Sequence, residues 1–129
     1  MIILFANQKG GVGKSTLAVL FSNYLSLAKN KAVTVYDMDF QRSLYNKAQA
    51  AQILENTPLY DVRASELNQF ESIYKVNEKE QRHVHIIDLA GKMDDDNLIP
   101  VLQKSHLIIC LLLRRVFRRI DHRILLCHF

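Results

Sequence analysis

A glycine-rich loop between an apolar segment and an amphipathic segment constrains this chain more than any other feature. Residues 10–16 read GGVGKST and follow the short apolar run at 2–6. Glycine lets a loop curl so that several backbone N–H groups point inward, and a helix that begins there adds partial positive charge. The pattern therefore predicts a buried strand, an anion-binding loop and a helix, in that order.

The residue types in this loop fit the phosphates of a nucleotide bound with magnesium. Lys14 would give its positive charge to the β- and γ-phosphates, and the Ser15 hydroxyl is placed to ligate Mg²⁺. The strict spacing G-x-x-x-x-G-K-[ST] is met only in relaxed form, with Gln8 or Lys9 at the first position. A glycine turn that caps a helix is the alternative, but GKST after a strand favours phosphate binding. The other expected binding residues are Gly10, Gly11, Val12, Gly13 and Thr16.

Strands and helices are predicted to alternate along the rest of the chain. Apolar runs predict further strands at 32–36, 59–62, 83–88 and 106–113, and helical spacing or capping predicts helices at 17–28, 43–54, 64–82 and 96–103. Such alternation predicts a parallel sheet with helices on both faces. The residues expected to pack the first helix on the sheet are Leu17, Leu20, Phe21, Tyr24, Leu25 and Ala28.

Carboxylates follow two of the predicted strands. Asp37 and Asp39 come after the strand at 32–36, and Asp88 ends the strand at 83–88. The carboxyl ends of parallel strands form the rim at which open α/β sheets bind ligands, so we expect these groups beside the glycine loop. A polar turn in which an aspartate caps a helix remains the alternative for Asp37 and Asp39.

The string KGGVGKST resembles the deviant Walker A loop of the ParA/MinD ATPases, and the resemblance covers about residues 1–113. Lys9 matches the signature lysine of that family, which implies a contact with the partner subunit's phosphates in a dimer. The segment DMDFQ resembles the family's first switch, with Phe40 in place of proline. The resemblance implies that Asp39 orients or activates the attacking water and that Asp37 supports the metal site.

A second segment, HVHIIDLAG at 83–91, resembles the Walker B strand and second switch of the same family. The resemblance implies that Asp88 holds Mg²⁺ through water and that the Gly91 backbone N–H meets the γ-phosphate. It also implies an α/β P-loop NTPase fold, here incomplete at the C-terminus, with ATP and Mg²⁺ as cofactors. Hydrolysis would be switched by nucleotide-dependent homodimerisation.

The first switch resembles the ParA branch more than MinD, which implies plasmid or chromosome partition with non-specific DNA and an adaptor protein as partners. Two other functions stay open. One is a truncated, inactive nucleotide-binding fragment. The other is a reductase similar to the nitrogenase iron protein, for which Cys110 and Cys127 are poorly placed as cluster ligands. We expect both cysteines to be buried apolar residues instead.

Positive charge is concentrated in the last residues of the chain. Residues 114–129 hold five of the 17 Lys and Arg residues but only one of the 13 acidic residues. Residues 1–113 therefore hold equal numbers of basic and acidic residues. We therefore divide the chain into the N-terminal part of an ATPase domain (1–113) and an atypical basic tail (114–129). An out-of-frame end of a truncated product is favoured for the tail; a MinD-like membrane anchor and an ordinary terminal helix are the alternatives.

The remaining polar groups carry weaker signals. The acidic run at 94–96 is interpreted as capping the helix that follows rather than as a metal site, and His83, His85, His106, His122 and His128 lack paired ligand spacing. Apolar runs are too short for a signal peptide or a membrane span, which predicts a cytoplasmic protein without a membrane partner.

Overall fold

The computed structural model describes residues 1–7, 11–54, 57–80, 82–90, 95–116 and 119–127, with side chains described as far as Leu111. The strands are β1 (Ile2–Ala6), β2 (Val33–Met38), β3 (Asp61–Ala64), β4 (Val84–Leu89), β5 (Leu107–Val116) and β6 (Arg119–Cys127). The helices are α1 (Lys14–Leu27), α2 (Ser43–Ile53), α3 (Phe70–Lys79) and α4 (Leu98–Lys104), with the 3₁₀ turn η1 (Leu67–Gln69) before α3.

One sheet holds all these strands, in the order β3-β2-β4-β1-β5-β6. The first five strands pair in parallel, and β6 is added antiparallel at the β5 edge. All five residues of β1 are buried, because β1 lies between β4 and β5 and has helices over both of its faces. The predicted α/β parallel sheet flanked by helices is confirmed.

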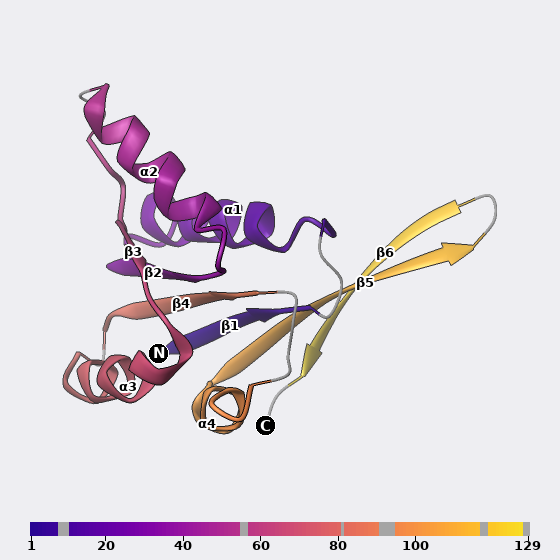
Figure 1. Cartoon of the computed structure of the whole chain (residues 1–129). Coiled ribbons are helices and arrows are strands. Elements are labelled where there is room, and N and C mark those ends of the chain that lie inside the picture. Colours follow the sequence, from indigo (N-terminus) through magenta and orange to yellow (C-terminus); the bar gives the residue numbers. More distant parts are fainter. Residues whose placement is uncertain (8–10, 55–56, 81, 91–94, 117–118, 128–129) are drawn as a thin grey trace.

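Two apolar layers cover the two faces of the sheet. Figure 1 shows α1 and α2 above the sheet and α3 and α4 below it. Beneath α1 the core contains Ile3, Phe5, Ala18, Val35 and Ile86, with partly buried Leu17, Phe21 and Leu25 packed against them. On the opposite face the core contains Leu4, Tyr36, Phe70, Ile73, Ile87 and Val101.

The face by which α1 contacts the sheet differs from the predicted one. Leu17, Phe21 and Leu25 do pack on the sheet, but Leu20 is 58% exposed and Tyr24 is 48% exposed. The most buried positions of the helix are Lys14, Ala18 and Ser22. Small side chains at 18 and 22 let the helix approach the sheet along that line, which turns Leu20 and Tyr24 outward.

The chain after the first five strands forms a strand, not a helix. β5 continues to Val116, and β6 pairs with it from Ile108↔Cys127 to Val116↔Arg119. Because β1 pairs only with residues 107–110 of β5, the later part of β5 has β6 as its neighbour, and the two extend away from the helices in Figure 1. Both helical interpretations of the basic tail, the membrane anchor and the terminal helix, are therefore wrong for 119–127.

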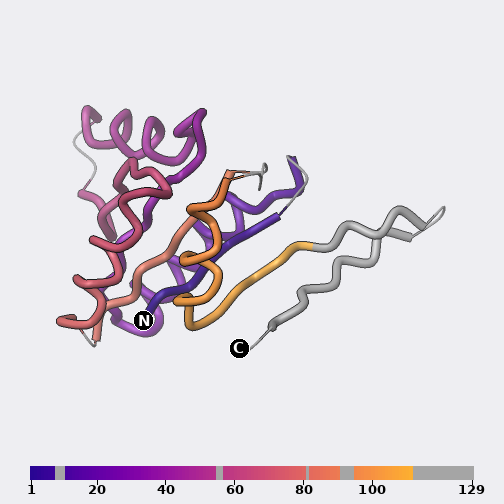
Figure 2. Tube along the Cα trace, turned by 60° about the horizontal axis from the view of Figure 1, so that its bottom comes forward, coloured from indigo at the N-terminus to yellow at the C-terminus, as the bar shows by residue number. Residues whose placement is uncertain are grey.

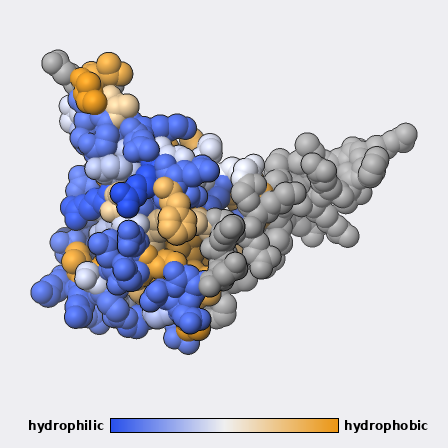
Figure 3. All heavy atoms as spheres, viewed as in Figure 1, coloured by the Kyte–Doolittle hydropathy of each residue, from blue (hydrophilic) through white to orange (hydrophobic). Residues whose placement is uncertain are grey.

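The surface contains apolar side chains as well as charged ones. Hydrophobic atoms are exposed at the far end of α2 in Figure 3, where Ile53 is 81% and Leu54 73% exposed. In the part of the chain that the structure describes, no helix combines the length and the apolar character needed to cross a bilayer. The cytoplasmic location stays a prediction.

Candidate functional site

The glycine loop lies where the order of the strands reverses. From β1 the chain passes through α1 to β2 on one side, whereas from β4 it passes through α4 to β5 on the other side. The carboxyl ends of β1 and β4 therefore stand beside each other at the point where open α/β sheets bind their ligands. Both the loop after β1 and Asp88 in β4 were predicted to lie here, and the structure places them together.

Two glycines give the loop its shape. Gly11 has φ 75° and Gly13 has φ 89°, which are left-handed conformations that disfavour any residue with a Cβ. Gly13 is also the N-cap of α1, and no side chain caps the helix there. The first turn of α1 contains no acidic residue either. No acidic side chain of the first turn therefore offsets the partial positive charge at this helix end or accepts hydrogen bonds from its N–H groups.

Lys14 and Asp88 form a buried ion pair at this helix end. The Lys14 ammonium donates a hydrogen bond to Asp88 Oδ1, and the two side chains are only 10% and 1% exposed. Asp88 Oδ2 is also buried and has no hydrogen-bond partner among the described residues. One carboxylate oxygen of Asp88 thus binds Lys14, and the other is available for a further polar group.

The surroundings of Asp88 act on its pKa in both directions. Burial raises the pKa of the Asp88 carboxyl most strongly, and the nearby negative charge of Asp37 raises it further. Lys14, by its charge and its hydrogen bond, and the Ser15 side chain both lower that pKa. Ser15 therefore lies close to Asp88, so the two residues predicted to serve a magnesium ion are neighbours in the structure.

Asp37 is hydrogen-bonded as a helix cap. It stands beside Asp88 in the register of β2 and β4 and is 1% exposed. Its Oδ2 accepts hydrogen bonds from the backbone N–H groups of Leu44 (2.9 Å) and Tyr45 (3.0 Å), and its Oδ1 accepts one from Asp39 N (3.1 Å). These contacts are those of the capping alternative, since they tie the first turn of α2 to the end of β2.

Asp39 lies in the turn between β2 and α2, beside a cavity of about 470 Å³. Its Oδ1 accepts a hydrogen bond of 2.9 Å from Gln41 N. The apolar walls of the cavity include Met38, Leu89 and Leu98. Phe40, which stands where the resembling switch has proline, lines the same cavity and is 95% exposed. Figure 3 shows apolar surface in the middle of this side of the molecule.

The other predicted site residues fall into two groups. Gly11, Val12, Gly13, Ser15 and Thr16 lie in the loop and the first turn of α1. Lys9, Gly10 and Gly91 lie outside the described residues.

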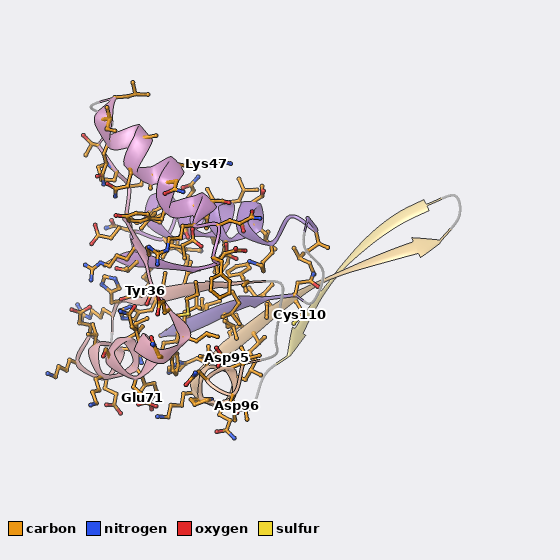
Figure 4. The ribbon with its side chains drawn as sticks, viewed as in Figure 1. Tyr36, Lys47, Glu71, Asp95, Asp96 and Cys110 are labelled. Carbon is orange, nitrogen blue, oxygen red and sulfur yellow. The ribbon has the colours of Figure 1, made fainter. Side chains whose placement is uncertain are left out.

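The acidic run before α4 was predicted to cap that helix, but among the described residues no side chain makes a capping hydrogen bond to α4. Asp95 Oδ1 accepts 2.8 Å hydrogen bonds from both the backbone and the side-chain amide of Asn97. Asp95 and Asp96 stand at the start of α4 in Figure 4, and Asp94 is outside the described residues.

The fold and the loop geometry define a P-loop NTPase fold, and comparison with known proteins identifies the family. A family model described as "AAA domain" matches residues 1–127. Protein ParA of Rhizobium radiobacter is 42% identical over 67 residues, which make up 51% of this chain and 30% of that protein. The chain belongs to this AAA-domain family, in its ParA/MinD-type branch. It spans less than a third of the length of the curated relative that it matches.

Solved structures share the fold of this chain. A plasmid partition protein from Borrelia burgdorferi superposes with a TM-score of 0.61 at 23% identity, covering 91% of this chain and 67% of that one. Another putative plasmid partition protein of Borrelia burgdorferi, bound to AMPPNP, gives a TM-score of 0.56 at 25% identity over 84% of this chain and 61% of that one. A ParA family ATPase from Chlorobium tepidum gives 0.56 at 17% identity, covering 84% of this chain and 59% of that one.

Sequence reasoning missed some features of this edge. The contact between Lys14 and Asp88 joins residues 74 positions apart, and no local pattern signals it. The cavity beside Asp39 also uses residues 65–68, whose sequence carries no recognised motif. Both the Lys14–Asp88 contact and the cavity follow from the order of the strands, because that order places β2, β4 and β1 side by side.

Proposed function

We propose that this chain binds Mg-ATP at the loop between β1 and α1 and hydrolyses it as a ParA-like protein of plasmid or chromosome partition. The observation that carries the proposal is the buried Lys14–Asp88 pair at an N-terminus of α1 that has no side-chain cap. Membership of the family supports it, as does the similar Borrelia burgdorferi protein that binds AMPPNP.

Phosphate binding would use the helix end and Lys14 together. Loop and first-turn N–H groups, from residues 10–16, would donate to the phosphate oxygens, and the helix end favours negative charge there. Lys14 would leave Asp88 and move its ammonium to the β- and γ-phosphates. The ion pair seen in the structure therefore represents a resting arrangement in which Asp88 holds the lysine within the site.

The residues beside Lys14 fit a magnesium ion. The Ser15 hydroxyl and the Asp88 carboxylate are oxygen ligands of the kind that Mg²⁺ prefers, and Asp88 Oδ2 is buried without a partner among the described residues. Bound there, Mg²⁺ would neutralise charge on the phosphate oxygens. Asp37 would support this site from the next strand, while its own oxygens stay engaged with α2.

Asp39 would orient or activate the attacking water, since the turn that carries it leaves the sheet at the same edge. Gly91 would present its N–H to the γ-phosphate. Lys9 would reach the phosphates of the partner subunit in a nucleotide-dependent homodimer, adding positive charge to the group being transferred.

The biological partners rest on family analogy. They are non-specific DNA and a partition adaptor protein, as proposed for the ParA branch. An inactive nucleotide-binding fragment is the alternative function. A MinD-like membrane-associated ATPase is not retained, because residues 119–127 form a strand instead of the anchoring helix.

Binding of a fluorescent ATP analogue with Mg²⁺ tests the site directly. Lys14→Ala should weaken binding about 10- to 100-fold, because a charge-assisted hydrogen bond contributes about 1.5–3 kcal/mol. Lys47→Ala is the matched control: Lys47 lies on the outside of α2 (Figure 4) and should bind like the wild type.

Lys14→Ala also removes the partner of Asp88, so a second variant keeps the test decisive if that protein unfolds. Ser15→Ala leaves the Lys14–Asp88 pair in place and should reduce binding in the presence of Mg²⁺ but not in EDTA. Equal binding by wild type, Lys14→Ala and Ser15→Ala would contradict the proposal.

A further inference from the structure

A cluster of potential metal ligands lies at the edge of the sheet opposite the glycine loop. Glu80 is the C-cap of α3, His83 follows it in the connection, and His85 is in β4. Each offers a ligand atom, and these atoms lie within 4.8 Å of one another. The N-terminus is at the same edge (Figure 2), where the Met1 amine donates a 2.7 Å hydrogen bond to the His83 carbonyl.

The two histidine rings are held in position by their neighbours. They stack with their centroids 4.7 Å apart and an interplanar angle of 23°. His83 Nε2 lies 2.9 Å from the Thr34 hydroxyl, and His85 Nδ1 lies 3.4 Å from the Tyr36 hydroxyl. Each ring is thus fixed from β2 through one nitrogen, as metal-binding imidazoles usually are.

Of the two remaining ring nitrogens, one faces Glu80 and the other has no partner among the described residues. His83 Nδ1 lies 3.4 Å from Glu80 Oε2. His85 is 1% exposed, and its Nε2 is buried with no hydrogen-bond partner among the described residues. An imidazole nitrogen buried without a partner costs free energy that a bound ion would recover.

We propose that Glu80, His83 and His85 form a binding site for a divalent transition-metal ion, with Zn²⁺ as the best match. Two imidazole nitrogens and one carboxylate oxygen are ligands that zinc accepts, and three protein ligands leave a fourth position for water. Closing the cluster requires its side chains to move, because ligands about 2 Å from one ion lie closer together than 4.8 Å. The Glu80 side chain is 51% exposed and can reorient, and the two stacked rings must turn so that the plane of each contains the ion.

The surroundings of the cluster decide which ions it can take. Mg²⁺ prefers oxygen ligands and is a poor match for two imidazoles, so this site is chemically distinct from the edge with Asp88 and Ser15. The Met1 amine and Arg63 place positive charge near His85, which opposes a cation, and Glu80 offsets part of it. A shallow hollow lined by Ala32, Lys79, Glu80, Arg82 and His83 leaves the cluster open to solvent.

A bound ion would connect three elements that the chain otherwise joins through a short turn. Glu80 belongs to the end of α3, His85 to β4, and the hydroxyl groups that orient the rings to β2. A metal ion that binds the folded chain but not the unfolded chain stabilises the folded state by mass action. Zinc should therefore raise the melting temperature.

Zinc binding to the full chain, measured by competition with a chromophoric chelator, tests the proposal. We expect the wild type to bind one Zn²⁺ at this cluster. Glu80→Gln and His83→Gln should each lower the zinc affinity about 10-fold or more. Both side chains are partly exposed, so these variants should fold. Glu78→Gln removes the same charge from an exposed position of α3 and should bind zinc like the wild type.

Two further measurements separate the cluster from other zinc sites. Excess Mg²⁺ should not displace this ion, and a chain with Cys110→Ser and Cys127→Ser should retain it. The rise in melting temperature with Zn²⁺ should disappear in Glu80→Gln and persist in Glu78→Gln. Equal zinc affinity of these two variants, or loss of binding with the cysteines, would overturn the proposal.

Discussion

At the scale of single residues, Lys14 and Asp88 form the centre of the candidate site. Each was predicted from its own motif, yet their contact across 74 residues came only from the structure. A motif identifies residue types, whereas the resting position of a lysine side chain depends on which strand stands next to β1. For the same reason the sequence left both interpretations of Asp37 open, metal support and helix cap.

Lys14→Ala should destabilise the nucleotide-free chain by about 3 kcal/mol, because it leaves a buried carboxylate without its partner. Adding Asp88→Asn should recover part of this loss, since the amide is neutral. Urea unfolding measures both changes, and Lys47→Ala should stay within about 0.5 kcal/mol of the wild type. A Lys14→Ala chain as stable as Lys47→Ala would show that the ion pair does not stabilise the fold.

His85 should make the metal-free chain sensitive to mild acid. Burial lowers the pKa of His85 to about 4 from 6.5, with smaller contributions from His83, the Met1 amine and Arg63. The folded chain therefore favours neutral His85, so this stability is present above pH 6.5 and is lost as pH falls toward 4.

The change from about pH 7.5 to about pH 5 corresponds to about 2 kcal/mol. Urea unfolding in EDTA should show the stability difference between wild type and His85→Gln shrinking by that amount over the same range. A difference that does not change with pH would mean that His85 titrates normally.

At the scale of elements, the apolar runs predicted the first five strands, β1 at its observed ends and the other four with ends shifted by one to three residues. The secondary structure of the tail at 114–129 could not be predicted from the sequence, because the spacing of its apolar residues also fits a helix. Residues 119–127 form a strand because they pair with β5, and no local sequence pattern indicates that pairing. The outward position of Leu20 likewise depends on how closely α1 approaches the sheet.

Asp37 should be needed for the start of α2. Asp37→Ala would leave three backbone N–H groups without their acceptor, at a cost of about 2 kcal/mol. Asp37→Asn keeps an oxygen acceptor and should cost less. Hydrogen exchange should show faster opening of α2 in Asp37→Ala than in Asp39→Ala, in which only the Gln41 N–H loses its acceptor. Equal exchange rates in the two variants would exclude the capping role.

Gly13 should be required for its backbone conformation rather than for space. A Cβ at this position would meet no atom within 4 Å, but φ is 89°. Gly13→Ala should therefore cost about 1–2 kcal/mol of stability through conformational strain alone. Thermal unfolding measures this cost. Stability equal to wild type would mean that the loop can adopt another conformation.

At the scale of the whole molecule, we propose a switch that works only when two chains meet across bound ATP. The fold places the glycine loop, Asp88 and the turn with Asp39 at one edge of the sheet. Lys9, immediately before that loop in sequence, is the residue proposed to act on the partner's phosphates.

The most direct measurement is the rate of ATP hydrolysis over a range of protein concentrations, for wild type, Lys14→Ala, Lys9→Ala and the control Lys47→Ala. We expect a rate that rises faster than linearly with concentration in wild type and Lys47→Ala, and no hydrolysis in Lys14→Ala or Lys9→Ala. A rate proportional to concentration that survives Lys9→Ala would contradict the dimeric switch. No hydrolysis by the wild type, with or without DNA, would favour the inactive nucleotide-binding fragment.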